Sequence, residues 1–175
     1  MTLEYKVTAR SQYLNYKPIV DNSIFLIVCI PYFLSRYGLQ SLLLIICFLI
    51  GWVLIHAIPI IILHVNYYHH NVDDILIYDS ITKNITYKHN GAAINFNESE
   101  IKYIRHYLSY PERRNRSGLL PWDKYSYIDI KFRGYDSVII SSLMIPDFKK
   151  FPPMLDLPND KLSKTPSYFF RMIKN

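Results

Sequence analysis

A chain of 175 residues with 50% hydrophobic and 15% aromatic side chains is too apolar and too rich in strand-forming residues to be intrinsically disordered. Its net charge of +6 is modest and no nucleic-acid-binding motif accompanies it, so a nucleic-acid partner is not expected. The two cysteines, Cys29 and Cys47, both lie in apolar segments, which argues against a disulfide framework.

The first feature of the chain is a pair of apolar runs. The run Leu39–Val65 contains 27 residues without a formally charged side chain. As a helix it is long enough to cross the roughly 30 Å hydrocarbon core of a bilayer. The preceding run, Ile24–Leu34, has only 11 residues and spans a bilayer if the residues from position 19 onward join the helix.

The short link Ser35–Gln40 between the two runs contains a glycine and is typical of a turn between antiparallel helices. The sequence therefore predicts a transmembrane hairpin over residues 19–66, with helices at about 19–35 and 39–65. Arg36 is the only charge in the turn, and basic residues flank the other ends of both helices, so the positive-inside rule predicts that both termini are cytoplasmic. A re-entrant first run would instead place the termini on opposite sides. The expected location is the bacterial inner membrane or a plasma membrane, with more than one span.

Two residues interrupt the second run. Pro59 is expected to kink the helix. His56 is interpreted as a hydrogen-bonding partner for a neighbouring helix, in preference to a proton relay, because neither apolar run, 24–34 or 39–65, contains an acidic residue that could pair with it.

The residues after the apolar runs change to a strand-like pattern. Asn90-Gly91 is the signature of a tight hairpin turn. The segment 100–107 fits a strand or a helix, and strand is chosen. Residues 143–151 can begin a short helix, which Pro152-Pro153 is expected to stop. The strands expected from β-branched and aromatic runs are residues 74–78, 84–88, 92–96, 100–107, 125–133 and 137–142.

Three segments in this region carry a family resemblance. Residues 77–87 (IYDSITKNITY), 94–104 (INFNESEIKYI) and 127–143 (YIDIKFRGYDSVIISSL) resemble bacterial pleckstrin-homology-like (PH-like) proteins that carry a two-helix hairpin before the barrel. The resemblance implies a bent, partly open barrel that is closed at one end by a C-terminal helix and serves as an interaction or lipid-contacting module.

The predicted fold class is thus an α+β membrane protein. A helical transmembrane hairpin is followed by a small antiparallel PH-like β-barrel or sandwich with a short C-terminal helix. The predicted parts besides the hairpin are a cytoplasmic N-terminal segment, 1–18, the PH-like β domain, 67–155, and a C-terminal tail, 156–175, which lies against the sheet or the membrane.

Histidines and acids gather just after the long apolar run. His64, His69 and His70 are the weak candidates for metal ligands, with Asp73 and Asp74 close behind. Their spacing matches no metal-site signature, and we interpret the histidines as part of an interfacial ring of amphipathic side chains, with the two aspartates in an exposed loop. No metal or cofactor is expected. The chain also lacks nucleophile and phosphate-loop motifs, so we expect no enzymatic activity and no small-molecule substrate.

The main concentration of positive charge is the loop that contains Arg113, Arg114, Arg116, Trp122 and Lys124. Three interpretations remain open: a solvated loop, contact with anionic lipid headgroups, or recognition of an acidic protein partner. These five residues are the candidate lipid- or partner-binding site.

The sequence favours a non-enzymatic, membrane-anchored adaptor whose partners are membrane lipids and either another protein or a second copy of the chain. One specific form of this hypothesis is an immunity or accessory protein of a bacterial secretion or toxin system. The alternative is an accessory or regulatory subunit of a larger membrane transporter or enzyme complex.

Overall fold

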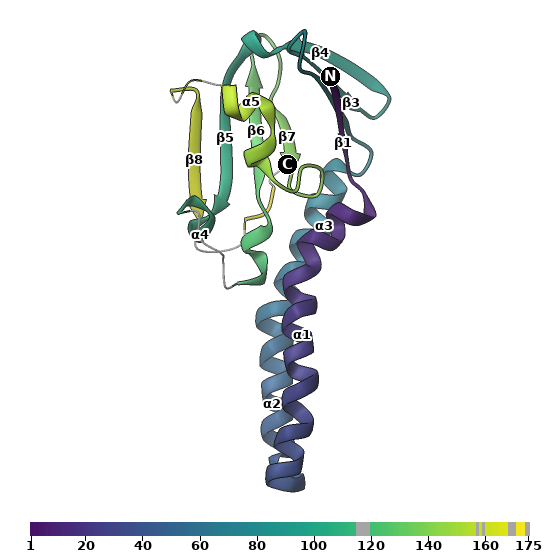
Figure 1. The fold of residues 1–175 in the computed structure, drawn as a ribbon, viewed down its shortest axis with the longest axis vertical. Coiled ribbons are helices and arrows are strands. Elements are labelled where there is room, and N and C mark those ends of the chain that lie inside the picture. Colours follow the sequence, from purple (N-terminus) through teal and green to yellow (C-terminus); the bar gives the residue numbers. More distant parts are fainter. Residues whose placement is uncertain (115–119, 157, 159, 168–170, 174–175) are drawn as a thin grey trace.

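The computed structural model describes residues 1–114, 120–156, 158, 160–167 and 171–173. It shows an α+β chain in which a long helical hairpin projects from a domain of two β-sheets (Figure 1).

The helical backbone continues without interruption for 63 residues, from Ala9 to Asn71. It begins with α1 (Ala9–Tyr37), reverses direction in the 3-10 turn Gly38–Ser41, and returns as α2 (Leu42–Trp52), a π-helical turn (Val53–Ala57) and α3 (Ile58–Asn71). The helices α1 and α2 lie side by side (Figure 1). The reversal starts at Gly38, whose φ of +64° is readily adopted only by glycine.

Both predicted helices are longer at their domain ends than the sequence indicated. Residues 9–18 belong to the predicted N-terminal segment, 1–18, yet they form the first turns of α1. Thr8 caps the helix in a reciprocal pair with Ser11, and the side chains of Ser11 and Asn15 are buried against the β domain. A count of apolar residues cannot find helical turns that pack through polar side chains.

The sequence predicts a kink at Pro59, and the structure has a π-helical turn just before this proline. Proline at position 59 has no N–H to donate to the preceding turn, and the backbone widens over Val53–Ala57, directly before it. Within this turn the His56 ring stacks on Trp52 at 5.9 Å between centroids.

The first sheet consists of β1 (Thr2–Lys6), β2 (Ile75–Asp79), β3 (Asn84–His89) and β4 (Ala92–Asn97), all antiparallel and in that order. Because β1 pairs with β2, with Leu3 opposite Tyr78, the hairpin is an insertion between the first two strands and does not precede the domain. The prediction that residues 1–18 stand outside the β domain is therefore wrong. A five-residue strand that pairs across a 68-residue insertion has no local signal in the sequence.

The second sheet has the order β7-β6-β5-β8, formed by β5 (Ile101–Ser109), β6 (Tyr127–Phe132), β7 (Val138–Ser141) and β8 (Leu162–Ser167). The strand β5 forms as predicted for 100–107. The strand β8 pairs in parallel with β5, so this part of the predicted tail, 156–175, belongs to the sheet.

The two sheets share one hydrophobic core, in which the rings of Phe96 and Phe132 stack at 3.7 Å between centroids. Phe148 and Phe151 cover one end of this core from a short 3-10 turn, Phe148–Lys150, and the helix α5 (Pro152–Asp156) follows. Pro152-Pro153 thus starts the short helix and does not stop one, because the first turn of a helix needs no backbone N–H from its residues. The turn predicted at Asn90-Gly91 is present, with positive φ at both residues.

Candidate membrane interface

The hairpin is apolar and uncovered along most of its length. It is long and apolar enough to cross a membrane, and only 6% of its most apolar window is buried. The exposed fractions of Leu39, Leu43 and Leu44 exceed 70%. A helix in a protein core would be buried, so a continuous exposed apolar surface of this kind marks contact with lipid or with another protein.

The base of the hairpin is held by two asparagines against the residues that end β7. In α1, the Asn15 amide donates to the backbone oxygen of Ser142 (3.2 Å), and the Asn15 side-chain oxygen accepts from the Ser142 hydroxyl (3.0 Å). In α3, the Asn71 amide donates to the backbone oxygen of Ile139 (3.0 Å) and its oxygen accepts from the backbone N–H of Ser141 (2.8 Å). All of Asn15, Asn71 and Ser142 are buried, so each helix of the hairpin is fixed to the second sheet.

Asp74 connects the base of the hairpin to the first sheet. Its carboxylate accepts hydrogen bonds from the Asn71 amide (2.7 Å) and the Tyr87 hydroxyl (2.7 Å), and it lies 2.6 Å from Nδ1 of His89. Burial, together with the bond to Asp74, raises the pKa of Tyr87, so the hydroxyl stays protonated and donates. Asp74 is only 1% exposed, which contradicts its assignment to an exposed loop. The neighbouring Asp73 is exposed, as expected.

A third contact joins α3 to the C-terminal residues. Asn66 exchanges two hydrogen bonds with the backbone of Ile173, at 3.1 and 2.8 Å, and the Tyr67 hydroxyl donates to the backbone oxygen of Arg171 (2.9 Å). Tyr67 is fully buried and meets the rings of Tyr125 and Tyr127 edge-on. We call Asn15, Asn66, Asn71, Asp74 and Ser142 the hairpin clamp, because they fix the hairpin to the domain by side-chain hydrogen bonds.

The three candidate metal ligands do not converge. His64 is buried, and its ring nitrogens lie 3.2 Å from the Tyr125 hydroxyl and 3.2 Å from the Gln12 side-chain oxygen. His69 is exposed and His70 is half-buried. Within the described residues, no group of three His, Cys, Asp or Glu side chains is placed to hold a metal ion. The interfacial-ring interpretation does not hold for His64, which packs against the domain.

Four of the five candidate binding residues are described, and they flank one end of the domain. Arg113 ends the short helix α4 (Tyr110–Arg113), Arg114 follows it, and Trp122 and Lys124 lie in the 3-10 turn Pro121–Lys124, which packs against α1 and α3. Arg116 lies outside the described residues. Figure 1 shows α4 at the end of the domain from which the hairpin projects.

Arg113, Arg114 and Lys124 are exposed, and we call these three residues the basic surface. The guanidinium of Arg114 lies over the Tyr110 ring, 4.6 Å from its centroid. Trp122 is half-buried and packs with the aromatic cluster at the base of the hairpin. The tryptophan therefore supports the loop from inside while the cations point outward.

The acidic residues in this loop are turned inward. Asp123 is buried, and its carboxylate accepts from the backbone N–H of Leu120 (3.0 Å). Desolvation raises the pKa of Asp123, and it also raises the pKa of Glu112. The outward face of the loop is consequently more positive than its composition indicates, which suits contact with anionic groups.

Comparison with protein families settles what the domain is. Residues 4–150, which extend from within β1 through the hairpin and β7 to the 3-10 turn Phe148–Lys150, match the family described as PH domain, and β8 lies beyond the matched range. The chain belongs to the PH domain family. Comparison with curated proteins and with solved structures gave no match.

The family match confirms the PH-like domain and clarifies its architecture. The matched range starts inside β1, so the hairpin lies within the PH domain sequence as an insertion between β1 and β2. A domain cut at residue 67 lacks its first strand. Sequence reasoning missed the hairpin clamp, although isolated asparagines at the ends of an apolar run are a usable signal for such contacts.

Proposed function

We propose that this PH domain protein is anchored in a membrane by its hairpin and holds its β domain against the membrane surface as a non-enzymatic adaptor. In this proposal both termini and the domain are cytoplasmic, and the membrane is a bacterial inner membrane or a plasma membrane. The domain binds a protein partner or a second copy of the chain, and the basic surface contacts anionic lipid headgroups. An immunity or accessory protein of a bacterial secretion or toxin system is one specific form of this role.

The observation that carries the proposal is the exposed apolar hairpin that is clamped to the PH domain. The part of α1 from Pro18 to Tyr37 has 20 residues, which corresponds to about 30 Å of helix and matches the hydrocarbon thickness of a bilayer. The ion pair between Lys17 and Asp21 (2.6 Å) lies at the domain end of this stretch. Since the clamp fixes the base of the hairpin, insertion of the hairpin also sets which side of the domain meets the lipid.

The basic surface supports the same orientation. It lies at the hairpin end of the domain, and each cation near an anionic leaflet contributes about 1 kcal/mol of attraction. A tethered domain gains from such weak contacts because the anchor keeps its local concentration high.

Membrane insertion is tested with the full chain. It should stay in the pellet after carbonate washing and float with vesicles in a density gradient. An accessible cysteine placed at exposed Lys88 should react with a membrane-impermeant maleimide only when the cytoplasmic side is open. Release into the supernatant overturns the anchoring, and labelling from outside the cell overturns the orientation.

Contact between the basic surface and lipid is tested by fluorescence. The chain has two tryptophans, so Trp52→Phe leaves Trp122 as the only one. Brominated phosphatidylglycerol in the vesicle should quench Trp122, and Arg113→Glu with Arg114→Glu should reduce that quenching. The matched control is Lys102→Glu with Arg133→Glu, exposed positions at the other end of β5 and β6, more than about 20 Å away along the strand. Equal quenching in both double variants removes the lipid role of the basic surface.

The accessory-subunit alternative is favoured by one feature of the hairpin. Nδ1 of His56 is buried and has no hydrogen-bond partner among the described residues, and a polar group of a neighbouring membrane helix could satisfy it. A variant in which residues 18–62 are replaced by an unrelated apolar hairpin keeps the hairpin clamp. This variant distinguishes the adaptor from the accessory subunit. An adaptor should still capture the same cross-linked partners in native membranes, whereas a subunit that uses its intramembrane surface should lose them.

A further inference from the structure

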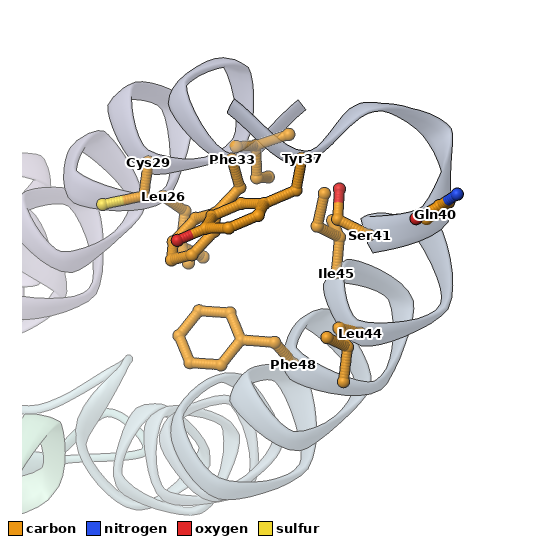
Figure 2. A pocket seen from close by; sticks show the side chains of 10 residues that line it. Leu26, Cys29, Phe33, Tyr37, Gln40, Ser41, Leu44, Ile45 and Phe48 are labelled. Carbon is orange, nitrogen blue, oxygen red and sulfur yellow. The ribbon is translucent and has the colours of Figure 1, made fainter. Parts of the chain in front are cut away.

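The two helices of the hairpin leave a groove between them at the end remote from the domain. Its volume is about 730 Å³, which is within the range of pockets that enclose small ligands. Figure 2 shows Phe33 and Tyr37 from α1 and Phe48 from α2 on opposite sides of this space. The side chains that line this interhelical groove are Leu26, Cys29, Ile30, Phe33, Tyr37, Gln40, Ser41, Leu44, Ile45 and Phe48.

The lining changes in polarity along the groove. Tyr37, Gln40 and Ser41 are the polar members, and all three lie at the turn between the helices. The members farther from the turn, such as Leu26 and Phe48, are apolar. Arg36, next to Tyr37, is exposed and is the only formally charged residue between Asp21 and Asp73. Arg36 itself does not line the groove but lies in the last turn of α1, next to the reversal. A groove that has an apolar interior, and a polar end with an exposed cation nearby, is complementary to a phospholipid, whose phosphate adjoins its acyl chains.

The same lining does not suit a transmembrane helix. Packing between membrane helices depends on glycine, alanine, serine and threonine, which let the backbones approach, and of these the lining contains only Ser41, at the turn. Large rings on both sides of the space favour a thin, flexible occupant that can follow an irregular surface. A straight partner helix would also have to place its own apolar side chains against the polar end.

We propose that the interhelical groove binds one acyl chain of a phospholipid from the leaflet opposite the PH domain, with the phosphate of that lipid beside Arg36. This inference rests on the membrane insertion proposed above. The bound lipid adds contacts to both α1 and α2 and stiffens the hairpin near its turn. The site is separate from the basic surface, which lies at the other end of the hairpin.

The two native cysteines provide a matched test. Cys29 lines the groove, whereas Cys47 is exposed and does not line it. The full chain is reconstituted in vesicles of phosphatidylcholine and phosphatidylglycerol, extracted in a mild detergent and analysed by native mass spectrometry. Wild type and C47W should retain one phospholipid per chain. C29W should retain at least about tenfold less, because an indole in an occupied, closely packed space carries a large steric cost.

A second variant tests the headgroup contact without changing the packing of the groove. Arg36→Gln should lower phospholipid retention about fivefold, the factor expected from one cation near a phosphate. Lipid-free wild type, or equal retention in C29W and C47W, overturns the proposal. A dimer mass that is lost only in C29W also overturns it, in favour of a second copy in the groove. Carbonate washing of the same variants measures membrane anchoring separately. A loss of lipid binding in the groove is therefore distinguishable from a loss of membrane insertion.

Discussion

Asn71 is the residue on which the joint between hairpin and domain most depends, and Asn71→Ala should weaken that joint strongly. The side chain makes three hydrogen bonds, to Asp74, to the backbone oxygen of Ile139 and from the backbone N–H of Ser141, and it is only 1% exposed. Each bond contributes about 1 kcal/mol net, and leaving a buried partner unsatisfied costs about 1–3 kcal/mol. The variant should therefore lose about 3–5 kcal/mol of stability.

The assay for Asn71→Ala is amide hydrogen exchange of the protein in micelles, read at Ser141, together with thermal unfolding. Loss of about 3 kcal/mol corresponds to a fall of about a hundredfold in the protection of the Ser141 amide. The matched control is Asn95→Ala on β4, where the side chain is exposed and accepts one hydrogen bond from Thr86, so the change should stay within about 0.5 kcal/mol. If the two variants unfold at the same temperature and protect Ser141 equally, the clamp does not hold the hairpin.

Other residues give further tests. Leu63→Ala removes a fully buried side chain at the base of the hairpin and should cost about 2–5 kcal/mol, whereas Ile61→Ala, two positions away and 53% exposed, should cost less than about 0.5 kcal/mol in the same unfolding assay. Burial lowers the pKa of His106 from 6.5 to about 4, with Lys164 and Lys149 adding to the shift. The unfolded chain therefore binds the proton more tightly, and the stability present above pH 6.5 should fall by roughly 3 kcal/mol as the pH drops through 4. His106→Leu should flatten this dependence, and a wild-type unfolding free energy that is constant from pH 7 to 4 contradicts it. Gly91→Ala should destabilise the β3–β4 turn by roughly 1 kcal/mol, because Gly91 has a φ of +79°, and an unchanged melting temperature would show that the turn relaxes without strain.

Local sequence patterns were sufficient to predict most strands and the turn at Asn90-Gly91. Asn90-Gly91 adopts the two positive φ values that its residue types favour, and the alternating run that contains Ile101 and Ile104 forms a strand although its spacing also fits a helix. Burial explains that outcome, because Ile101 and Ile104 both enter the core shared by the two sheets, and the shift in register between Ile101 and Tyr103 lets residues three apart do so. Tertiary burial selected between two local options that the sequence left equal.

The candidate sites differ in how many of their residues the sequence indicated. Charge density alone located Arg113, Arg114 and Lys124, and the structure adds that Asp123 faces inward. The hairpin clamp was missed because most of its hydrogen bonds join a single polar side chain to a segment far away in the chain. Asn15 and Ser142, for example, are separated by 127 positions. Hydrogen bonds between such residues depend on the fold and have no local pattern.

What the sequence by itself determined is the set of local properties: an apolar helical hairpin, short strands after it, and a basic loop. These follow from the side chains of contiguous residues, through the apolar period, turn chemistry and charge. Only the tertiary structure decided that β1 pairs with β2 around the hairpin, that β8 joins β5 in parallel, and that Asp74 is buried. Those outcomes depend on pairings between distant segments, whose free energy is gained only when the whole core is assembled, and so no short stretch of the chain encodes them.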